Sequence, residues 1–130
     1  MNTYSRDGMH RAITEKIIGA AIEVHRAMGP GLLESTYEEC LDRELRDCGL
    51  VVSRQLAVPL MYKGKPLDST YILDLVVEKS VIVEIKAVDK LARIHLAQML
   101  SYLQHTGLHV GLLLNFNSVT LTDGIRRISL

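Results

Sequence analysis

The fold of this chain is decided by the segment Tyr71-Ile-Leu-Asp-Leu-Val-Val-Glu-Lys-Ser-Val-Ile-Val-Glu-Ile-Lys86. It contains two short runs of β-branched and apolar residues, 71–77 and 81–86, on either side of the polar sequence Glu78-Lys79-Ser80. Runs of this kind, separated by a short polar turn, predict a β-hairpin. The segment therefore predicts two antiparallel strands joined by a three-residue loop.

The register of this hairpin sets two carboxylates opposite each other. The pairs that a three-residue loop produces are Val77 with Val81, Leu75 with Val83, Asp74 with Glu84, and Ile72 with Lys86. Tyr71 and Leu73 then lie on the same face as Leu75. A two-residue loop is excluded, because a slip of one residue would turn the two acids to different faces and mismatch the apolar residues.

Two acids in this position predict a bound cation. Directly opposed cross-strand residues have Cβ atoms roughly 4.5 to 5.5 Å apart, and like charges at that distance are destabilising. At an effective dielectric constant of about 20, the repulsion at about 5 Å is on the order of 3 kcal/mol. Hard divalent ions prefer carboxylate and carbonyl oxygens. Mg²⁺ or Mn²⁺ is therefore expected, with Asp74, Glu84 and the backbone carbonyl of Ile85 as ligands.

Lys86 extends this candidate site, because it lies two residues from Glu84 and therefore on the same face of the strand. Beside a divalent ion, its charge would orient a nucleophilic water or stabilise a developing oxyanion in metal-assisted hydrolysis. The alternative is a solvated sheet face that carries a Glu–Lys ion pair. A glycosidase-like use of Asp74 and Glu84 is less favoured, since inversion needs a wider separation and leaves Lys86 without a role.

Length and composition favour a single globular domain over residues 1–130. A chain of 130 residues can bury about two thirds of its unfolded surface in one core. Apolar residues make up 48% of the chain and charged residues 23%, which argues against disorder. The net charge is zero, so nucleic acid would have to be attracted by a local patch of charge.

The sequence also bears on cellular location. No apolar run approaches the ~20 residues that cross a bilayer, and the polar N-terminus lacks the apolar core of a signal peptide. A cytoplasmic protein with no membrane partner is expected. Cys40 and Cys48 lie in one predicted helix, roughly 12 Å apart along its axis, which excludes a disulfide between them.

Hydrophobic periodicity predicts an α/β domain with a mixed central sheet flanked by helices. The expected helices span residues 9–28, 32–47 and 91–105, and the expected strands span 52–62, 71–77, 81–86 and 110–114, with weak extended pieces near 120 and 125–128. The first three strands are antiparallel, and a helix connects them to the further strand. The apolar stripe predicted for the second helix consists of Leu33, Tyr37, Leu41, Leu45 and Cys48.

Three polar residues on the predicted helices are further candidates for the site. Gln98 and Tyr102, four residues apart, project from one face of the helix that follows the Glu84 strand, and this face borders either a substrate or water. Glu34 lies in the first turn of the second helix. An acid there also stabilises the helix dipole by about 0.3 to 1 kcal/mol, which is a purely structural alternative.

Together these pieces resemble the GxxExxY proteins, a family assigned to the PD-(D/E)XK nuclease-like superfamily. The name-giving motif corresponds to Gly31-Leu-Leu-Glu34-Ser-Thr-Tyr37. The other matching pieces are Leu73-Asp74-Leu75, Val83-Glu84-Ile85-Lys86-Ala87, Gln98 to Tyr102, Asn115-Phe116-Asn117 and Asp123-Gly124-Ile125-Arg126-Arg127. The resemblance covers about residues 13–128, and the order and spacing of the pieces make it specific.

The resemblance implies a PD-(D/E)XK nuclease-like core and assigns roles within it. The superfamily's strand acid and E-x-K residues correspond to Asp74, Glu84 and Lys86. Glu34 takes the place of the acid on the leading helix. Gln98 and Tyr102 match a Gln-x-x-x-Tyr motif that borders the substrate and metal site in exonuclease-like branches.

The expected activity is Mg²⁺- or Mn²⁺-dependent hydrolysis of phosphodiesters in DNA or RNA. Ile72 departs from the pattern, because many relatives carry arginine there and isoleucine removes a possible phosphate contact. The alternative is a catalytically inactive module that keeps the fold and binds nucleic acid or protein. Such a module would act as a homodimer or with a partner protein, through an exposed sheet edge or the first helix.

Overall fold

The computed structural model describes the backbone of residues 3–130 and the side chains of residues 8–130. The helices are α1 (Thr3–Met28), α2 (Glu34–Asp47) and α3 (Arg93–Thr106), with a short 3₁₀ helix, η1 (Leu121–Gly124). The strands are β1 (Val52–Tyr62), β2 (Lys65–Val77), β3 (Val81–Lys86), β4 (Val110–Asn115) and β5 (Ile125–Ser129). The main differences from expectation are that α1 begins at residue 3 and β2 at residue 65. The expected extended piece near residue 120 is also wrong, because the chain forms the 3₁₀ helix η1 there.

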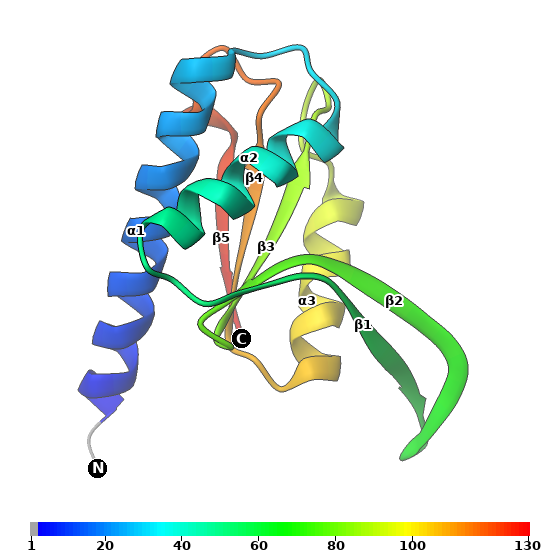
Figure 1. Ribbon diagram of the computed structural model, residues 1–130. Coiled ribbons are helices and arrows are strands. Elements are labelled where there is room, and N and C mark those ends of the chain that lie inside the picture. The colour runs from blue at the N-terminus through cyan, green and yellow to red at the C-terminus, as the bar shows by residue number, and fades with distance from the viewer. Residues whose placement is uncertain (1–2) are drawn as a thin grey trace.

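The five strands form one mixed sheet in the order β1-β2-β3-β4-β5 (Figure 1). All neighbouring strands are antiparallel except β3 and β4, which are parallel. Parallel neighbours need a crossover connection, and α3 provides it. The predicted α/β fold, with three antiparallel strands followed by a helix and a further strand, is therefore confirmed. Within residues 3–130, no helix is both long enough and apolar enough to cross a bilayer.

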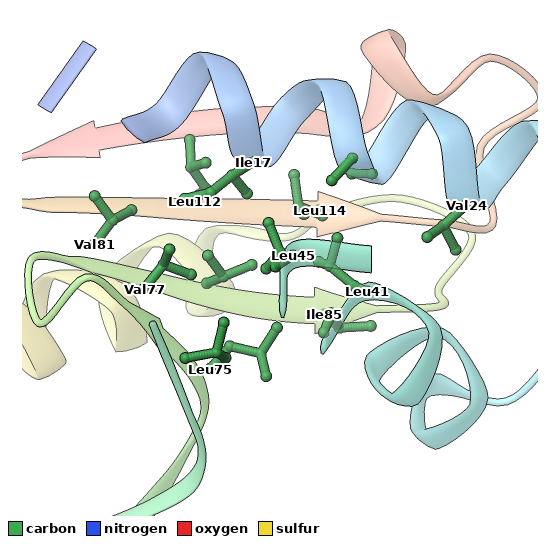
Figure 2. Close-up of a cluster of buried hydrophobic side chains, with 14 of the residues drawn as sticks. Ile17, Val24, Leu41, Leu45, Leu75, Val77, Val81, Ile85, Leu112 and Leu114 are labelled. Carbon is green, nitrogen blue, oxygen red and sulfur yellow. The ribbon is translucent and has the colours of Figure 1, made fainter. Parts of the chain in front are cut away.

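The main core lies between the sheet and the helices α1 and α2. Figure 2 shows its side chains, which include Ile17, Val24, Leu41, Leu45, Leu75, Val77, Val81, Ile85, Leu112 and Leu114. A smaller cluster on the opposite face packs Ile82 and Leu113 against Met99 and Leu103 of α3. Strands β3 and β4 are buried on both faces, which explains why their sequences are almost continuously apolar.

The predicted three-residue loop between β2 and β3 is confirmed. Val77 pairs with Val81 and Leu75 with Val83. Within the loop, Glu78 and Lys79 have φ angles of 54° and 53°, and the Ser80 N–H donates to the Val77 carbonyl at 3.0 Å. The register on which the candidate site depends is therefore the register of the structure.

Beyond Leu75 and Val83, however, the two strands separate. Their pairing ends at this point, so the predicted pairing of Ile72 with Lys86 is wrong. The prediction that Tyr71 and Leu73 share the face of Leu75 is also wrong, because both pack in the cluster beside α3. The physical reason is an irregularity at Asp74 that interrupts the simple alternation of side chains along β2.

Past this irregularity, β1 and β2 continue as a two-stranded ribbon, residues 56–72, that extends away from the helices (Figure 1). Every side chain from 56 to 72 is exposed or only partly buried. Isolated two-stranded ribbons are marginally stable in water. Helix α3 therefore supports the ribbon only at its base, where Val58 and Tyr71 pack against the cluster beside α3, and no helix within residues 3–130 supports the rest of it up to the turn at Lys63-Gly64.

The apolar stripe of α2 is shorter than predicted. Tyr37, Leu41 and Leu45 are fully buried, but Leu33 and Cys48 are exposed. These two residues are the N-cap and C-cap of the helix, so their side chains lie outside its buried face. Both cysteines are free, as expected.

Tyr37 fixes the start of α2. Its hydroxyl donates to the Gly29 carbonyl and accepts from the Leu32 N–H at 3.1 Å, which closes the turn between α1 and α2. Its ring stacks on Phe116, with ring centroids 4.6 Å apart. Gly31, with a φ of 98°, supplies a conformation in this turn that other residues rarely adopt. These contacts position the first turn of α2, where Glu34 lies.

We expect Tyr37→Phe to lower the free energy of unfolding by about 1 to 2 kcal/mol, because the Leu32 N–H and the Gly29 carbonyl lose their partner. Urea unfolding measures the change. Tyr62→Phe is the matched control, since Tyr62 is 61% exposed, and should change stability by less than about 0.5 kcal/mol. Equal effects of the two substitutions would show that the Tyr37 hydroxyl does not hold the turn.

Candidate active site

Asp74 and Glu84 meet where β2 and β3 separate. The Asp74 Oδ2 accepts a hydrogen bond from the Ile85 N–H at 2.9 Å, and the Glu84 Oε1 accepts one from the Asp74 N–H at 3.2 Å. Side-chain oxygens thus replace backbone carbonyls at the first position beyond the paired part of the hairpin. The predicted juxtaposition of the two acids is present, with each carboxylate bonded to the opposite strand.

The backbone of Ile85 faces the gap between the two strands. In an extended strand, the N–H and C=O of one residue point to the same side. The Ile85 N–H is directed at Asp74 of β2, so its carbonyl also points toward β2. A carbonyl oxygen and two carboxylates consequently border the same opening in the sheet.

The Glu84 carboxyl is electrostatically strained. It is only 5% exposed, and its pKa is raised to about 8, first by burial and then by the negative charge of Asp74. The hydrogen bond from the Asp74 N–H and the positive charge of Lys86 act in the opposite direction and lower this pKa. A carboxyl in this state gains stability from any further positive charge that enters the opening.

Lys86 ends β3 next to these acids. It pairs with Asn115 of β4, and its carbonyl accepts from the Phe116 N–H at 2.9 Å, so its backbone is fixed. Its side chain is half-buried and forms no ion pair with any residue from 8 to 130. The amino group is therefore free to respond to a ligand.

Glu34 reaches the same end of β3 from α2. The Glu34 Oε2 accepts a hydrogen bond from the Ala87 N–H at 3.0 Å, one residue beyond Lys86. Glu34 is the first residue of α2 and is exposed, so its second carboxylate oxygen remains accessible. The structure thus brings the leading-helix acid to the border of the site.

Of the two predicted residues on α3, Tyr102 has an electrostatic relation to the acids. The pKa of Tyr102 is raised by burial and then by the negative charges of Glu84 and Asp74, which places its phenol within their field. The Tyr102 ring packs on Tyr71, with centroids 4.6 Å apart. Gln98 is exposed and makes no hydrogen bond with the described part of the chain.

Sequence reasoning missed a second group, which lies behind the site. Glu38 of α2 is buried and accepts hydrogen bonds from Arg54 Nε at 2.8 Å and Gln55 Nε2 at 2.7 Å. Gln55 has a φ of 53°, a conformation that costs roughly 1 to 2 kcal/mol for a residue other than glycine. The available signal was the spacing of Glu34 and Glu38, four residues apart on one helix face.

Asn115 is another residue that the sequence did not single out by itself. It ends the apolar strand β4, is 2% exposed, and bonds both backbone groups of Val88. This side chain fixes the loop that follows Lys86. A polar residue at the end of an otherwise apolar strand was the signal for such a role.

The donor set fits a hard divalent ion in part. Among residues 8–130, no three His, Cys, Asp or Glu side chains gather closely enough to hold a metal ion. Asp74 and Glu84 supply two carboxylates, and Ile85 supplies a carbonyl. Mg²⁺ commonly binds through one or two carboxylates and completes its coordination with water and substrate phosphates. Two carboxylates and a carbonyl therefore match this mode of binding.

Comparison with known families agrees with this geometry. The family model described as the PD-(D/E)XK nuclease superfamily matches residues 11–128. No curated protein shows significant similarity to the chain, and neither does any solved structure.

We expect the metal-free protein to lose stability as the pH rises from about 5 to 8. The pKa of Glu84 is raised in the folded state to about 8, so folding binds a proton throughout this window. The loss amounts to at most roughly 4 kcal/mol. Glu84→Gln should remove most of it, whereas Glu15→Gln, at an exposed position of α1, should not. Urea unfolding in a chelating buffer at several pH values measures both. Parallel pH profiles for wild type and Glu84→Gln would contradict the raised pKa.

Proposed function

The chain belongs to the PD-(D/E)XK nuclease superfamily, and on this premise we propose that it is a Mg²⁺- or Mn²⁺-dependent phosphodiesterase that hydrolyses DNA or RNA. The observation that carries the proposal is the contact of Asp74 with Glu84 across the opened end of the hairpin. Two acids in a mostly buried position gain stability from a cation. Nuclease chemistry uses such an ion at the scissile phosphate.

In this proposal Asp74, Glu84 and the carbonyl of Ile85 hold the ion. When bound, the ion neutralises charge on the phosphate and makes a water molecule a better nucleophile. Glu84 must be ionised to serve as a ligand, and its pKa of about 8 means that the ion competes with a proton. The affinity for the ion therefore rises with pH through this range.

Lys86 and Glu34 act on the substrate side of the two ligands. The Lys86 ammonium, free of any ion pair within residues 8–130, donates to the phosphate as negative charge develops there. Glu34 holds the end of β3 through the Ala87 N–H with one oxygen. Its other oxygen accepts a hydrogen bond from the attacking water.

Gln98 and Tyr102 contact the substrate from α3. The position of Tyr102 beside the acids supports this role, because a phenol there can donate to a phosphate or pack on a sugar or base. Lys90 and Arg126 line a cavity of about 150 Å³ next to Asn115, at the end of β4. Asp89 and Asp123 line the same cavity, so two carboxylates balance its two positive charges.

We also propose that the chain belongs to the GxxExxY branch. Each residue of the motif has a structural reason here: Gly31 makes the turn into α2, Glu34 reaches β3, and Tyr37 closes the turn. The motif would therefore serve to deliver one carboxylate to the end of β3.

Divalent ions should raise the melting temperature of the wild-type protein. At a concentration ten times the Kd, the expected rise is roughly 5 °C, and it should be larger at pH 8 than at pH 6. Asp74→Asn should abolish the shift, while Asp68→Asn, at an exposed position of β2, should keep it. Scanning fluorimetry with Mg²⁺ and with Mn²⁺ measures the shift. An unchanged melting temperature for the wild type would contradict the proposed metal site.

The wild-type protein should cleave at least one member of a panel of single- and double-stranded DNA and RNA in Mg²⁺ or Mn²⁺. Lys86→Ala should lower the cleavage rate by about 100-fold or more, because it removes a donor to the developing charge. Lys16→Ala, on the exposed side of α1, is the control. Metal-dependent stabilisation without cleavage of any nucleic acid would instead favour the inactive binding module, alone, as a dimer or with a partner protein.

A further inference from the structure

We propose that Glu38 is a positioning residue, which holds Gln55 in a left-handed conformation and thereby keeps the sheet open at Asp74. The role of this opening in binding an ion rests on the function proposed above. The geometry that creates the opening does not depend on it. The proposal rests on a buried glutamate with two exposed partners, one unusual backbone angle and one gap in the strand pairing.

The gap lies at one position between β1 and β2. Arg54 pairs with Leu75 and Leu56 pairs with Leu73, but the pairing skips Gln55 and the residue opposite it, Asp74. Gln55 has a φ of 53°, in a region that residues with a Cβ avoid. An unfavourable angle of this kind persists only where surrounding contacts determine it.

The contact that determines it comes from α2. Gln55 Nε2 donates to Glu38 Oε1 at 2.7 Å, so the side chain of Gln55 is turned toward the helix. Arg54 Nε donates to Glu38 Oε2 at 2.8 Å and balances the buried charge. Glu38 is 6% exposed, and both of its oxygens are engaged. One buried carboxylate thus fixes two successive residues of β1.

The hydrogen-bonding directions of β2 explain why this matters at Asp74. Alternate residues of a central strand bond to opposite neighbours. The Ser80 N–H bonds to Val77 on the β3 side, and the Glu78 N–H bonds to Val51 on the β1 side. By the same alternation, Asp74 would bond to Gln55 of β1 in a regular sheet.

Because Gln55 is rotated, Asp74 is released from β1. Its N–H bonds to Glu84 Oε1 instead, and its carboxylate bonds to the Ile85 N–H. The rotation of Gln55 is therefore what allows Asp74 to lie against Glu84 and Ile85. Helix α2 acts on both sides of the opening, since Glu34 bonds the end of β3 and Glu38 bonds β1.

The test uses glycine to separate positioning from general stability. Glu38→Ala should release Gln55 to an extended conformation, restore regular pairing and free the Ile85 N–H from Asp74. Gln55→Gly in the same chain should rescue the opening, because glycine adopts positive φ without an anchor. Gln55→Val, with Glu38 intact, should close the opening, because a β-branched residue strongly disfavours this angle. Glu39→Ala, at the exposed neighbouring position on α2, is the control.

Two measurements on the full chain decide the outcome. The first is the through-hydrogen-bond scalar coupling of the Ile85 amide nitrogen in the metal-free protein, measured by NMR, which identifies its acceptor. The acceptor should change from the Asp74 carboxylate to a backbone carbonyl of β2 in Glu38→Ala and Gln55→Val, and return to the carboxylate in Glu38→Ala/Gln55→Gly. The second is Mn²⁺ affinity by calorimetry, which should fall and recover in the same order. If Glu38→Ala does not fold, Gln55→Val gives the same reading with the buried carboxylate in place.

The proposal is overturned if the Ile85 N–H still bonds the Asp74 carboxylate in both Glu38→Ala and Gln55→Val, as it should in Glu39→Ala, or if glycine does not restore this bond in Glu38→Ala/Gln55→Gly. Failure of the proposed function has a different signature. In that case the wild type binds no Mn²⁺, while the acceptor of the Ile85 N–H still depends on Glu38 and Gln55.

Discussion

The hydrogen bond between the Ile85 N–H and the Asp74 carboxylate is the contact on which the candidate site depends. A buried backbone donor must find an acceptor, and here a side chain of the neighbouring strand replaces the carbonyl that continued pairing would have supplied. Because a side chain takes the place of the backbone acceptor, space remains between β2 and β3, and the Ile85 carbonyl points into this space. Burial raises the pKa of Glu84, and the charge of Asp74, which this contact holds nearby, raises it further. The repulsion between the two acids and the opening of the sheet both result from the hydrogen bond between the Ile85 N–H and the Asp74 carboxylate.

Much of this arrangement could be predicted from the sequence, because it follows from local rules. The apolar residues of 71–77 and 81–86 alternate with a period of two, and only a three-residue loop brings them into register, so Val77 had to pair with Val81. The same register placed Asp74 next to Glu84. The parallel strand β4 was recognisable because its sequence is apolar on both faces.

What the sequence did not predict depends on contacts between distant residues. The turn of β2 at Asp74, which moves Leu73 and Tyr71 to the α3 side, requires Gln55 to be held by a glutamate 17 residues earlier in the chain. Strict alternation of side chains along β2 would place Leu73 and Tyr71 on the face of Leu75. It gives no sign of the contact between Gln55 and Glu38. Glu34 was placed by resemblance, since its position in the first turn of a helix is equally explained by the helix dipole.

The two sides of the site differ in how well they are packed, because one of them is the ribbon of residues 56–72. On one side are strands packed between helices, and on the other is a pair of strands that Val58 and Tyr71 tie to α3 only at its base and that then extends away from the helices (Figure 1). Local opening takes little free energy where few apolar contacts are lost. The ribbon can therefore fray from its tip at Lys63-Gly64 back toward Tyr71 while the contacts of Tyr71 and Val58 with the α3 cluster remain intact. A long polymer bound across the site would contact packed strands on one side and the ribbon on the other. Only the ribbon can change its conformation to fit the polymer.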